Sequence, residues 1–213
     1  MRRGGVRVSE SPRTPRSKQR KRWLVGIGNV FLGIAIGLLG YGLVTDLVAR
    51  INQNSLRGQL PAAAASNAPS GAGYDWSGWA TQDRAYWDKL APGGVFGRLV
   101  IGSMPLDTVV VKGATRETLK KGPGWIEWST YPGPVGTAGI SGHRVTWLHP
   151  FRNLDRVKVG DTIDFYSPYR VYRYRVRKVY TVTPDRGDVG MGKEAPLLVL
   201  TALTGVFAVA ASW

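Results

Sequence analysis

The feature that most constrains this chain is a run of 21 residues, from Leu24 to Val44, that contains no charged side chain. As a helix rising 1.5 Å per residue it would be about 31 Å long, close to the roughly 30 Å of a bilayer's hydrocarbon core. Its six glycines would weaken a helix in water, whereas glycine is frequent in membrane helices. The sequence therefore predicts a single transmembrane helix, which we place at residues 23–45.

A cleaved signal peptide is the alternative interpretation of this run. The apolar region of a signal peptide is about 7–15 residues long and ends in a small-x-small cleavage site. The run here is longer, and the first alanine-rich stretch, Ala62–Ala65, lies too far downstream. Both observations favour an uncleaved membrane anchor.

Basic residues are distributed unevenly around the anchor. Residues 1–22 carry nine Lys and Arg, whereas only Arg50 and Arg57 follow closely. The positive-inside rule then predicts a cytoplasmic N-terminus, a single pass through the cell membrane and an extracellular domain. A basic tail can also indicate a nucleic-acid partner, but the adjoining membrane segment explains it and we expect no nucleic acid. We predict that the basic cytoplasmic tail, residues 1–22, is disordered.

Residues 46–91 are expected to be an extracellular spacer followed by a short helix. The stretch from Arg50 to Gly73 is rich in Asn, Gln, Ala, Ser, Pro and Gly, a composition typical of a flexible spacer. The stretch from Asp75 to Leu90 carries Trp and Tyr at spacings that suit an amphipathic helix. We expect these aromatic side chains to dock the helix on the domain that follows.

From Pro92 the pattern changes to short apolar segments separated by Gly and Pro turns, which predicts an all-β barrel or sandwich over residues 92–213. One helical turn is expected at Thr115–Lys120, with Thr115 as its N-cap. The predicted strands are residues 96–101, 108–111, 125–128, 138–141, 162–166, 171–180, 197–201 and 206–210.

Two of these strands end in recognisable motifs: one leads into Gly142-His143-Arg144, the other into Thr201-Ala202. Further motifs occur around them in a fixed order: Leu119-Lys120-Lys121-Gly122-Pro123-Gly124, Tyr131-Pro132-Gly133, Pro150-Phe151-x-x-Leu154-Asp155, Val159-Gly160-Asp161 and Tyr172-x-Tyr174-x-Val176. Together they resemble the sortase family, most closely the actinobacterial class E group, over roughly residues 95–202. The resemblance implies a closed eight-stranded β-barrel, preceded here by the single transmembrane helix and held outside a Gram-positive membrane.

The resemblance also implies cysteine transpeptidation. In the family a thiolate attacks the Thr–Gly carbonyl of a sorting signal such as Leu-Pro-x-Thr-Gly or Leu-Ala-x-Thr-Gly, and an amine of a cell-wall precursor resolves the thioester. The implied partners are therefore the sorting-signal peptide, the precursor amine and the membrane. His143 matches the family's histidine, Thr201 the residue before the nucleophile, and Ala202 the position of the nucleophile itself.

The chain departs from the family at two places. It contains no cysteine, so Ala202 offers no nucleophile, and residues 203–213 carry no charge where the family has an arginine. We therefore predict that the chain as written is catalytically impaired. Two alternatives stay open, a non-catalytic binder of sorting-signal peptides or wall components, and the product of a frame-shifted C-terminus.

The sequence predicts no cofactor and no metal. Some sortases bind calcium through acidic loop residues, and Asp185, Asp188 and Glu194 lie in a comparable stretch, but the Pro and Gly residues among them are typical of an ordinary loop. The residues that contact substrate are not identified by the sequence.

Overall fold

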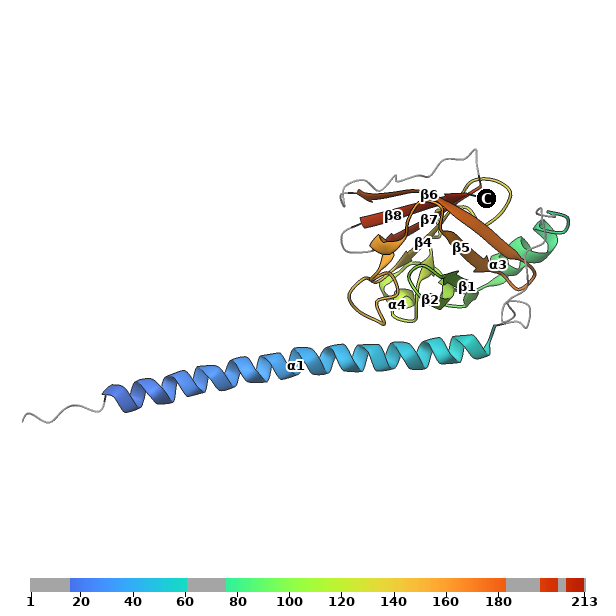
Figure 1. Cartoon of the computed structure of the whole chain (residues 1–213). Coiled ribbons are helices and arrows are strands. Elements are labelled where there is room, and N and C mark those ends of the chain that lie inside the picture. Colours follow the sequence, from blue (N-terminus) through green and yellow to red (C-terminus); the bar gives the residue numbers. More distant parts are fainter. Residues whose placement is uncertain (1–15, 61–75, 183–195, 203–205, 213) are drawn as a thin grey trace, which may run out of the picture. The chain divides into compact units, whose positions relative to one another are not determined.

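The computed structural model describes residues 16–60, 76–182, 196–202 and 206–212 (Figure 1). The chain divides into two compact units, residues 1–42 and residues 43–213. Helix α1 (Arg16–Gly58) contributes its first part to one unit and its residues 43–58 to the other. Each unit is described by itself below.

The apolar run lies inside α1, as expected. From Arg22 onward α1 is long and apolar enough to cross a membrane, with a mean hydropathy of 2.0 in its most apolar window and no residue of that window buried. The prediction of a disordered tail is wrong for residues 16–22, which are helical. The helix begins directly after Pro15, and the Lys- and Arg-rich residues that follow are good helix formers. Residues 1–15 lie outside the described part.

The predicted flexible spacer is also wrong at its start, because α1 continues to Gly58. Thr45, Ala49, Gln53 and Leu56 are buried, and their spacing of four, four and three residues places them on one helical face. Composition did not reveal this buried face, because the segment is rich in polar Asn and Gln residues. Residues 59 and 60 form a turn after α1, and residues 61–73 of the predicted spacer lie outside the described residues.

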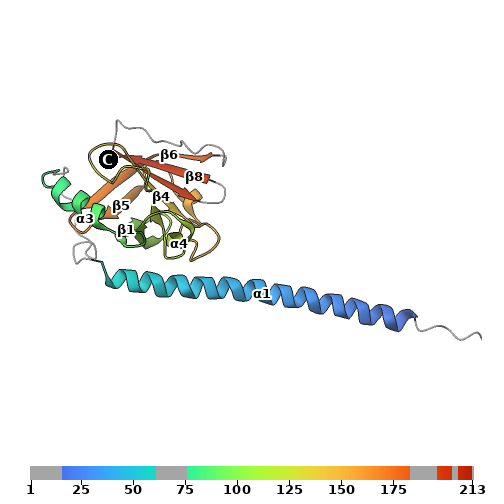
Figure 2. The same ribbon diagram turned by 180° about the vertical axis from the view of Figure 1, so that it is seen from behind.

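The prediction of a closed eight-stranded barrel is confirmed. The strands follow one another around the barrel in the order β1-β2-β3-β4-β7-β8-β6-β5, and β5 closes onto β1. Figure 2 shows the barrel from behind, with β8 beside β6. The strands are β1 (Val95–Ile101), β2 (Leu106–Lys112), β3 (Gly124–Trp125), β4 (Thr137–Gly142), β5 (Thr162–Tyr166), β6 (Val171–Val182), β7 (Leu197–Ala202) and β8 (Val206–Ser212).

Four short helical elements complete the described fold: the π-turn η1 (Ala80–Arg84), α3 (Ala85–Lys89) directly after it, the single turn α4 (Arg116–Leu119), and the 3₁₀ turn η2 (Leu154–Arg156). The predicted N-cap is confirmed, since the Thr115 side chain accepts the Thr118 N–H. The strand predicted at residues 125–128 is wrong in its bounds, because β3 spans only Gly124–Trp125. The Ser129 N–H donates to the Ile126 carbonyl at 2.9 Å, so the chain turns there instead of continuing the ladder.

The barrel core contains a cluster of aromatic rings among its aliphatic side chains. Trp87 of α3 is fully buried and stacks on Phe96 of β1 with ring centroids 4.9 Å apart. Its indole N–H donates to the Phe96 carbonyl at 2.8 Å. This contact fixes the aromatic helical segment on the barrel, as the sequence predicts. In β6, Tyr172 and Tyr174 point inward and are buried, in keeping with strand alternation.

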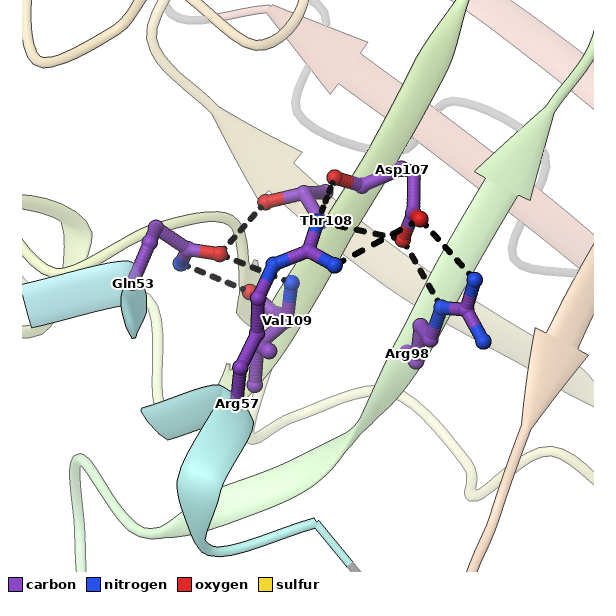
Figure 3. A network of polar contacts seen from close by, with 6 residues as sticks. All are labelled: Gln53, Arg57, Arg98, Asp107, Thr108 and Val109. Carbon is purple, nitrogen blue, oxygen red and sulfur yellow. Dashed lines mark hydrogen bonds and ion pairs between the residues drawn. The ribbon is translucent and has the colours of Figure 1, made fainter. Parts of the chain in front are cut away.

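Side chains of α1 cover an edge of β2 that the barrel leaves open (Figure 3). Because β3 has two residues, it pairs with β2 only at Val111 and Lys112. Before that point, Gln53 Oε1 accepts the Val109 N–H at 2.9 Å and Gln53 Nε2 donates to the Val109 carbonyl at 3.1 Å. Arg57 donates to the Asp107 carbonyl and pairs with its carboxylate at 3.2 Å.

The spacings of the two elements match. Residues four apart on a helix are about 5–6 Å apart, and residues two apart on a strand about 6–7 Å. Gln53 and Arg57 therefore meet Val109 and Asp107 in turn, and the helix replaces a missing strand neighbour. An unpaired strand edge is prone to pair with another chain, so this cover also protects the barrel.

Candidate functional site

The parallel pairing of β4 and β7 brings the two motif-bearing strand ends together. Thr201 lies opposite Ser141 and Ala202 opposite Gly142. Neighbouring strands are about 4.8 Å apart and each residue advances about 3.3 Å, which puts the Cα atoms of Ala202 and His143 roughly 6 Å apart. The pairing predicted from the two motifs is therefore present in the backbone.

Ala202 and Thr201 present opposite faces of β7. The Ala202 side chain is buried and belongs to the main hydrophobic core cluster, whereas Thr201 is half-buried. Side chains alternate along a strand, so of these two residues Ala202 directs its Cβ to the inside of the barrel, as Leu198 and Leu200 do. A methyl group at this place has neither a lone pair nor a proton to transfer.

His143 is half-buried at the end of β4. Its Nδ1 lies 3.3 Å from the Thr146 hydroxyl. Its Nε2 is buried and has no hydrogen-bond partner among the residues that the structure describes. Buried polar atoms are nearly always paired, so an unpaired ring nitrogen is unusual. Burial lowers the pKa of the imidazole, which favours the neutral form that can accept or pass on a proton.

Gly142 is required by close packing under the histidine. A Cβ on Gly142 would lie 2.9 Å from Cδ2 of Phe151, which is itself fully buried. The Phe151 N–H donates to the His143 carbonyl at 3.1 Å. The ring of Phe151 therefore holds the strand end against the core and sets where the histidine leaves the sheet.

The chain after His143 has an unusual backbone. Trp147, Leu148 and His149 have φ angles of 53°, 62° and 38°, three consecutive non-glycine residues in the left-handed region. The Leu148 N–H donates to Asp46 Oδ1 of α1 at 2.9 Å. Sequence reasoning missed Asp46. The available signal was that Asp46 is the only charged residue between Arg22 and Arg50.

The position expected for the family's arginine falls on β8. Ala210 of β8 pairs with Val199 of β7, so the strand runs beside the one that ends at Ala202. The sequence has no charged residue here. The acidic residues weighed for calcium, Asp185, Asp188 and Glu194, lie outside the described residues. Within the described residues no three His, Asp or Glu side chains come together as a metal site would require.

Comparisons with known proteins agree with this geometry. Residues 99–207 match the family model of the sortase domain, which is half of the chain. The chain is 31% identical to sortase A of Bacillus anthracis over 96 residues, which is 45% of this chain and 45% of that protein. The match therefore spans less than half the length of this curated relative.

Solved sortases share the fold. The Clostridium perfringens sortase D5 transpeptidase superposes with a TM-score of 0.60 and 19% identity, covering 78% of this chain and 97% of that one. Sortase E of Streptomyces avermitilis gives 0.54 and 24%, covering 58% and 90%. Sortase C of C. perfringens, solved with the C-terminal cell wall sorting motif, gives a TM-score of 0.54 and 20% identity, covering 62% of this chain and 82% of that one.

The matched segment contains both strand ends described above, the one that leads to His143 and the one that ends at Ala202. At these identities the solved structures establish a common barrel, and the family model covers that barrel from β1 into β8. This chain belongs to the sortase family.

Proposed function

We propose that this protein is a membrane-anchored sortase of the class E type whose transpeptidase site is catalytically impaired. The observation that carries the proposal is the in-register pairing of Gly142 with Ala202, which brings His143, the next residue, close to Ala202. The sequence motifs assign Ala202 to the position of the family nucleophile. Thr201 is the flanking residue in this assignment. The class E assignment rests on the order of the sequence motifs.

The reaction of a cysteine transpeptidase shows which step this chain would lack. In a cysteine transpeptidase, thiolate sulfur bonds to the Thr carbonyl carbon, the C–N bond to Gly breaks, and a histidine gives its proton to the departing amine. A wall-precursor amine then displaces sulfur and passes its own proton back. Ala202 cannot form the C–S bond. His143 alone offers acid or base help, which is typically worth about 10²–10⁴-fold, and residues 203–213 contain no arginine that could stabilise the oxyanion.

The proposed ligand is a sorting-signal peptide of the Leu-Pro-x-Thr-Gly or Leu-Ala-x-Thr-Gly kind. A non-catalytic binder of this peptide is the second candidate function. It is favoured by the buried Nε2 of His143, which has no hydrogen-bond partner within the described part of the chain and which a bound peptide amide or carboxylate could satisfy. The substrate-contacting residues are not assigned.

The proposed topology has the N-terminus in the cytoplasm and the barrel outside the cell, because nine basic residues precede the apolar helix. Protease added to intact protoplasts is expected to remove the barrel and spare the tail. Barrel released into the medium without residues 1–44 would contradict an uncleaved anchor.

A quenched fluorescent sorting-signal peptide tests the enzymatic part. The unmodified chain should show no turnover, Ala202→Cys little, and Ala202→Cys with Ala210→Arg measurably more, because one oxyanion donor is typically worth about 10²–10³-fold. Turnover by the unmodified chain that disappears in His143→Ala would overturn the proposal. Fluorescence anisotropy with the same peptide tests the binder: saturable binding by the unmodified chain, weakened in His143→Ala, supports it.

A further inference from the structure

We propose that Asp46 is a positioning residue that ties the docked turns of α1, residues 45–58, to the loop that carries His143. This loop, residues 143–153, is called the histidine loop below. All of these residues belong to the same compact unit. The contact itself is independent of the proposed function, which the inference uses only for the importance of His143.

The contact joins residues that are 102 positions apart in the sequence. Asp46 Oδ1 accepts the N–H of Leu148 at 2.9 Å, and Asp46 is half-buried. A hydrogen bond to a charged acceptor is about twice as strong as one between neutral groups. The carboxylate of a residue at the edge of the apolar run is therefore used to hold one particular amide of the histidine loop.

That amide belongs to the middle of the left-handed turn. Residues with a Cβ are disfavoured there because the Cβ crowds the following carbonyl, and such conformations persist only where surrounding contacts impose them. Asp46 holds Leu148, and Lys120 Nζ lies 5.8 Å from the ring centroid of Trp147. Without Asp46, the central residue of the turn loses a contact that favours its backbone conformation.

The left-handed turn also positions the imidazole of His143. Thr146 closes it by accepting the His149 N–H at its carbonyl, at 2.8 Å, and its hydroxyl lies 3.3 Å from His143 Nδ1. The geometry of residues 146–149 therefore sets where the Thr146 hydroxyl stands. That hydroxyl in turn engages one ring nitrogen and leaves the buried Nε2 unpaired among the described residues.

Asp46 is itself held at a fixed place. Ala49 and Gln53, one and two turns further along α1, are buried, and Gln53 hydrogen-bonds to the edge of β2. A side chain that positions another works best when its own supports are rigid. A cavity of about 260 Å³ lies between these turns, the start of β2 and the histidine loop; Leu148 and Pro150 line it on the side of the loop.

Leu148 lines this cavity, so the cavity affects what happens to the Leu148 N–H when Asp46 is removed. It is large enough for water, so a released Leu148 N–H would be solvated instead of buried unpaired. The expected result is a loosened histidine loop on an intact barrel. Hydrogen exchange measures such local opening directly.

The test is hydrogen exchange by mass spectrometry on the full-length chain in detergent micelles, with NMR of the His143 ring as a second readout. Asp46→Ala should speed exchange in residues 143–153 roughly tenfold or more, the range for loss of a hydrogen bond to a charged group. It should also shift the His143 ring signals. Asp46→Asn keeps a neutral acceptor and should give an intermediate increase.

The matched control is Asp161→Ala. Asp161 Oδ2 accepts the Lys158 N–H at 2.8 Å, an equivalent carboxylate–amide bond in another turn. This variant should leave exchange in the histidine loop unchanged. Equal, uniform acceleration over all strands in Asp46→Ala would overturn the proposal in favour of a general stabilising role.

Unchanged exchange and ring signals in both Asp46 variants would also overturn it. If Asp46→Ala does not fold, the graded effect of Asp46→Asn decides alone. None of these readouts depends on peptide binding or turnover, so a failure here is distinct from a failure of the proposed function.

Discussion

Gln53→Ala is the substitution that most directly probes the unexpected docking of α1 on the barrel. Gln53 is 7% exposed, and its side chain satisfies three backbone groups, the Val109 N–H, the Val109 carbonyl and the Lys121 carbonyl. It also accepts from the Thr108 hydroxyl at 3.0 Å, as Figure 3 shows. Alanine at this position removes all of these bonds at once.

The magnitude follows from the groups left behind. A buried backbone group without its partner costs about 1–3 kcal/mol. The neighbouring cavity admits water to part of this edge, so we count two groups at the lower half of that range and expect a loss of about 2–4 kcal/mol. A domain of 150–250 residues loses about 2–4 °C in Tm for each kcal/mol. The expected fall in Tm is therefore about 5–15 °C.

Thermal unfolding of the full-length chain in detergent, followed by tryptophan fluorescence, measures this fall. Ser55→Ala is the matched control, because Ser55 is exposed on the same helix and surface substitutions stay within about 0.5 kcal/mol. If Gln53→Ala lowers the Tm no more than Ser55→Ala does, the helix is not an integral part of the barrel and the docking argument is refuted.

Three further predictions concern other contacts of the barrel. Gly122→Ala should destabilise the same docking, because a Cβ there would lie 2.2 Å from Gln53 Nε2 and 2.9 Å from the Val109 carbonyl oxygen; its loss of Tm should not add fully to that of Gln53→Ala. Asp83→Ala should cost about 3–5 kcal/mol, because the fully buried Asp83 pairs with Arg170, whose side chain is only 14% exposed; urea unfolding with no change in midpoint would contradict this. Burial lowers the pKa of His143, so the unfolded chain binds a proton at a higher pH than the folded chain does. The corresponding stability is present above the ordinary pKa of about 6.5 and is lost as the pH falls through that region; His143→Gln should flatten the profile of urea midpoint against pH, and an unchanged profile would contradict it.

Much of the barrel was predictable because its signals are local. The strand containing Tyr172 and Tyr174 was predicted at residues 171–180, and Thr115 was predicted as the N-cap of a helical turn, a place that threonine favours. The apolar run likewise gave the helix. Each of these depends on residues within a few positions of one another, where periodicity and turn chemistry decide the structure.

The rest depends on contacts between distant segments. The length of β3 is set by a turn at Ile126–Ser129, and the continuation of α1 past Arg50 by an edge of β2 that needs partners. Asp46 reaches Leu148 across 102 residues. A polar helix face of Gln and Arg has no apolar periodicity to reveal it, so composition suggested a spacer instead.

The same difference between local signals and contacts of distant segments applies to the candidate site. The motifs placed His143 and Ala202 at neighbouring strand ends, and the β4–β7 register agrees. The left-handed turn after His143 was not predictable, because the first two of its residues, Trp147 and Leu148, are not of the types that favour positive φ. The role of His143 stays a prediction for experiment.

Trapping an acyl-enzyme at position 202 tests the central claim most directly. Because the chain has no cysteine, any single Cys variant carries one thiol only. Ala202→Cys incubated with excess Leu-Pro-x-Thr-Gly or Leu-Ala-x-Thr-Gly peptide should gain the acyl mass in an intact-protein spectrum, most clearly with Ala210→Arg added, and should lose it in His143→Ala. Thr201→Cys, one residue back on the opposite face of β7, should gain none. Equal acylation at both positions, or none at position 202 in a folded protein, would contradict the assignment of Ala202 as the vacant place of the nucleophile.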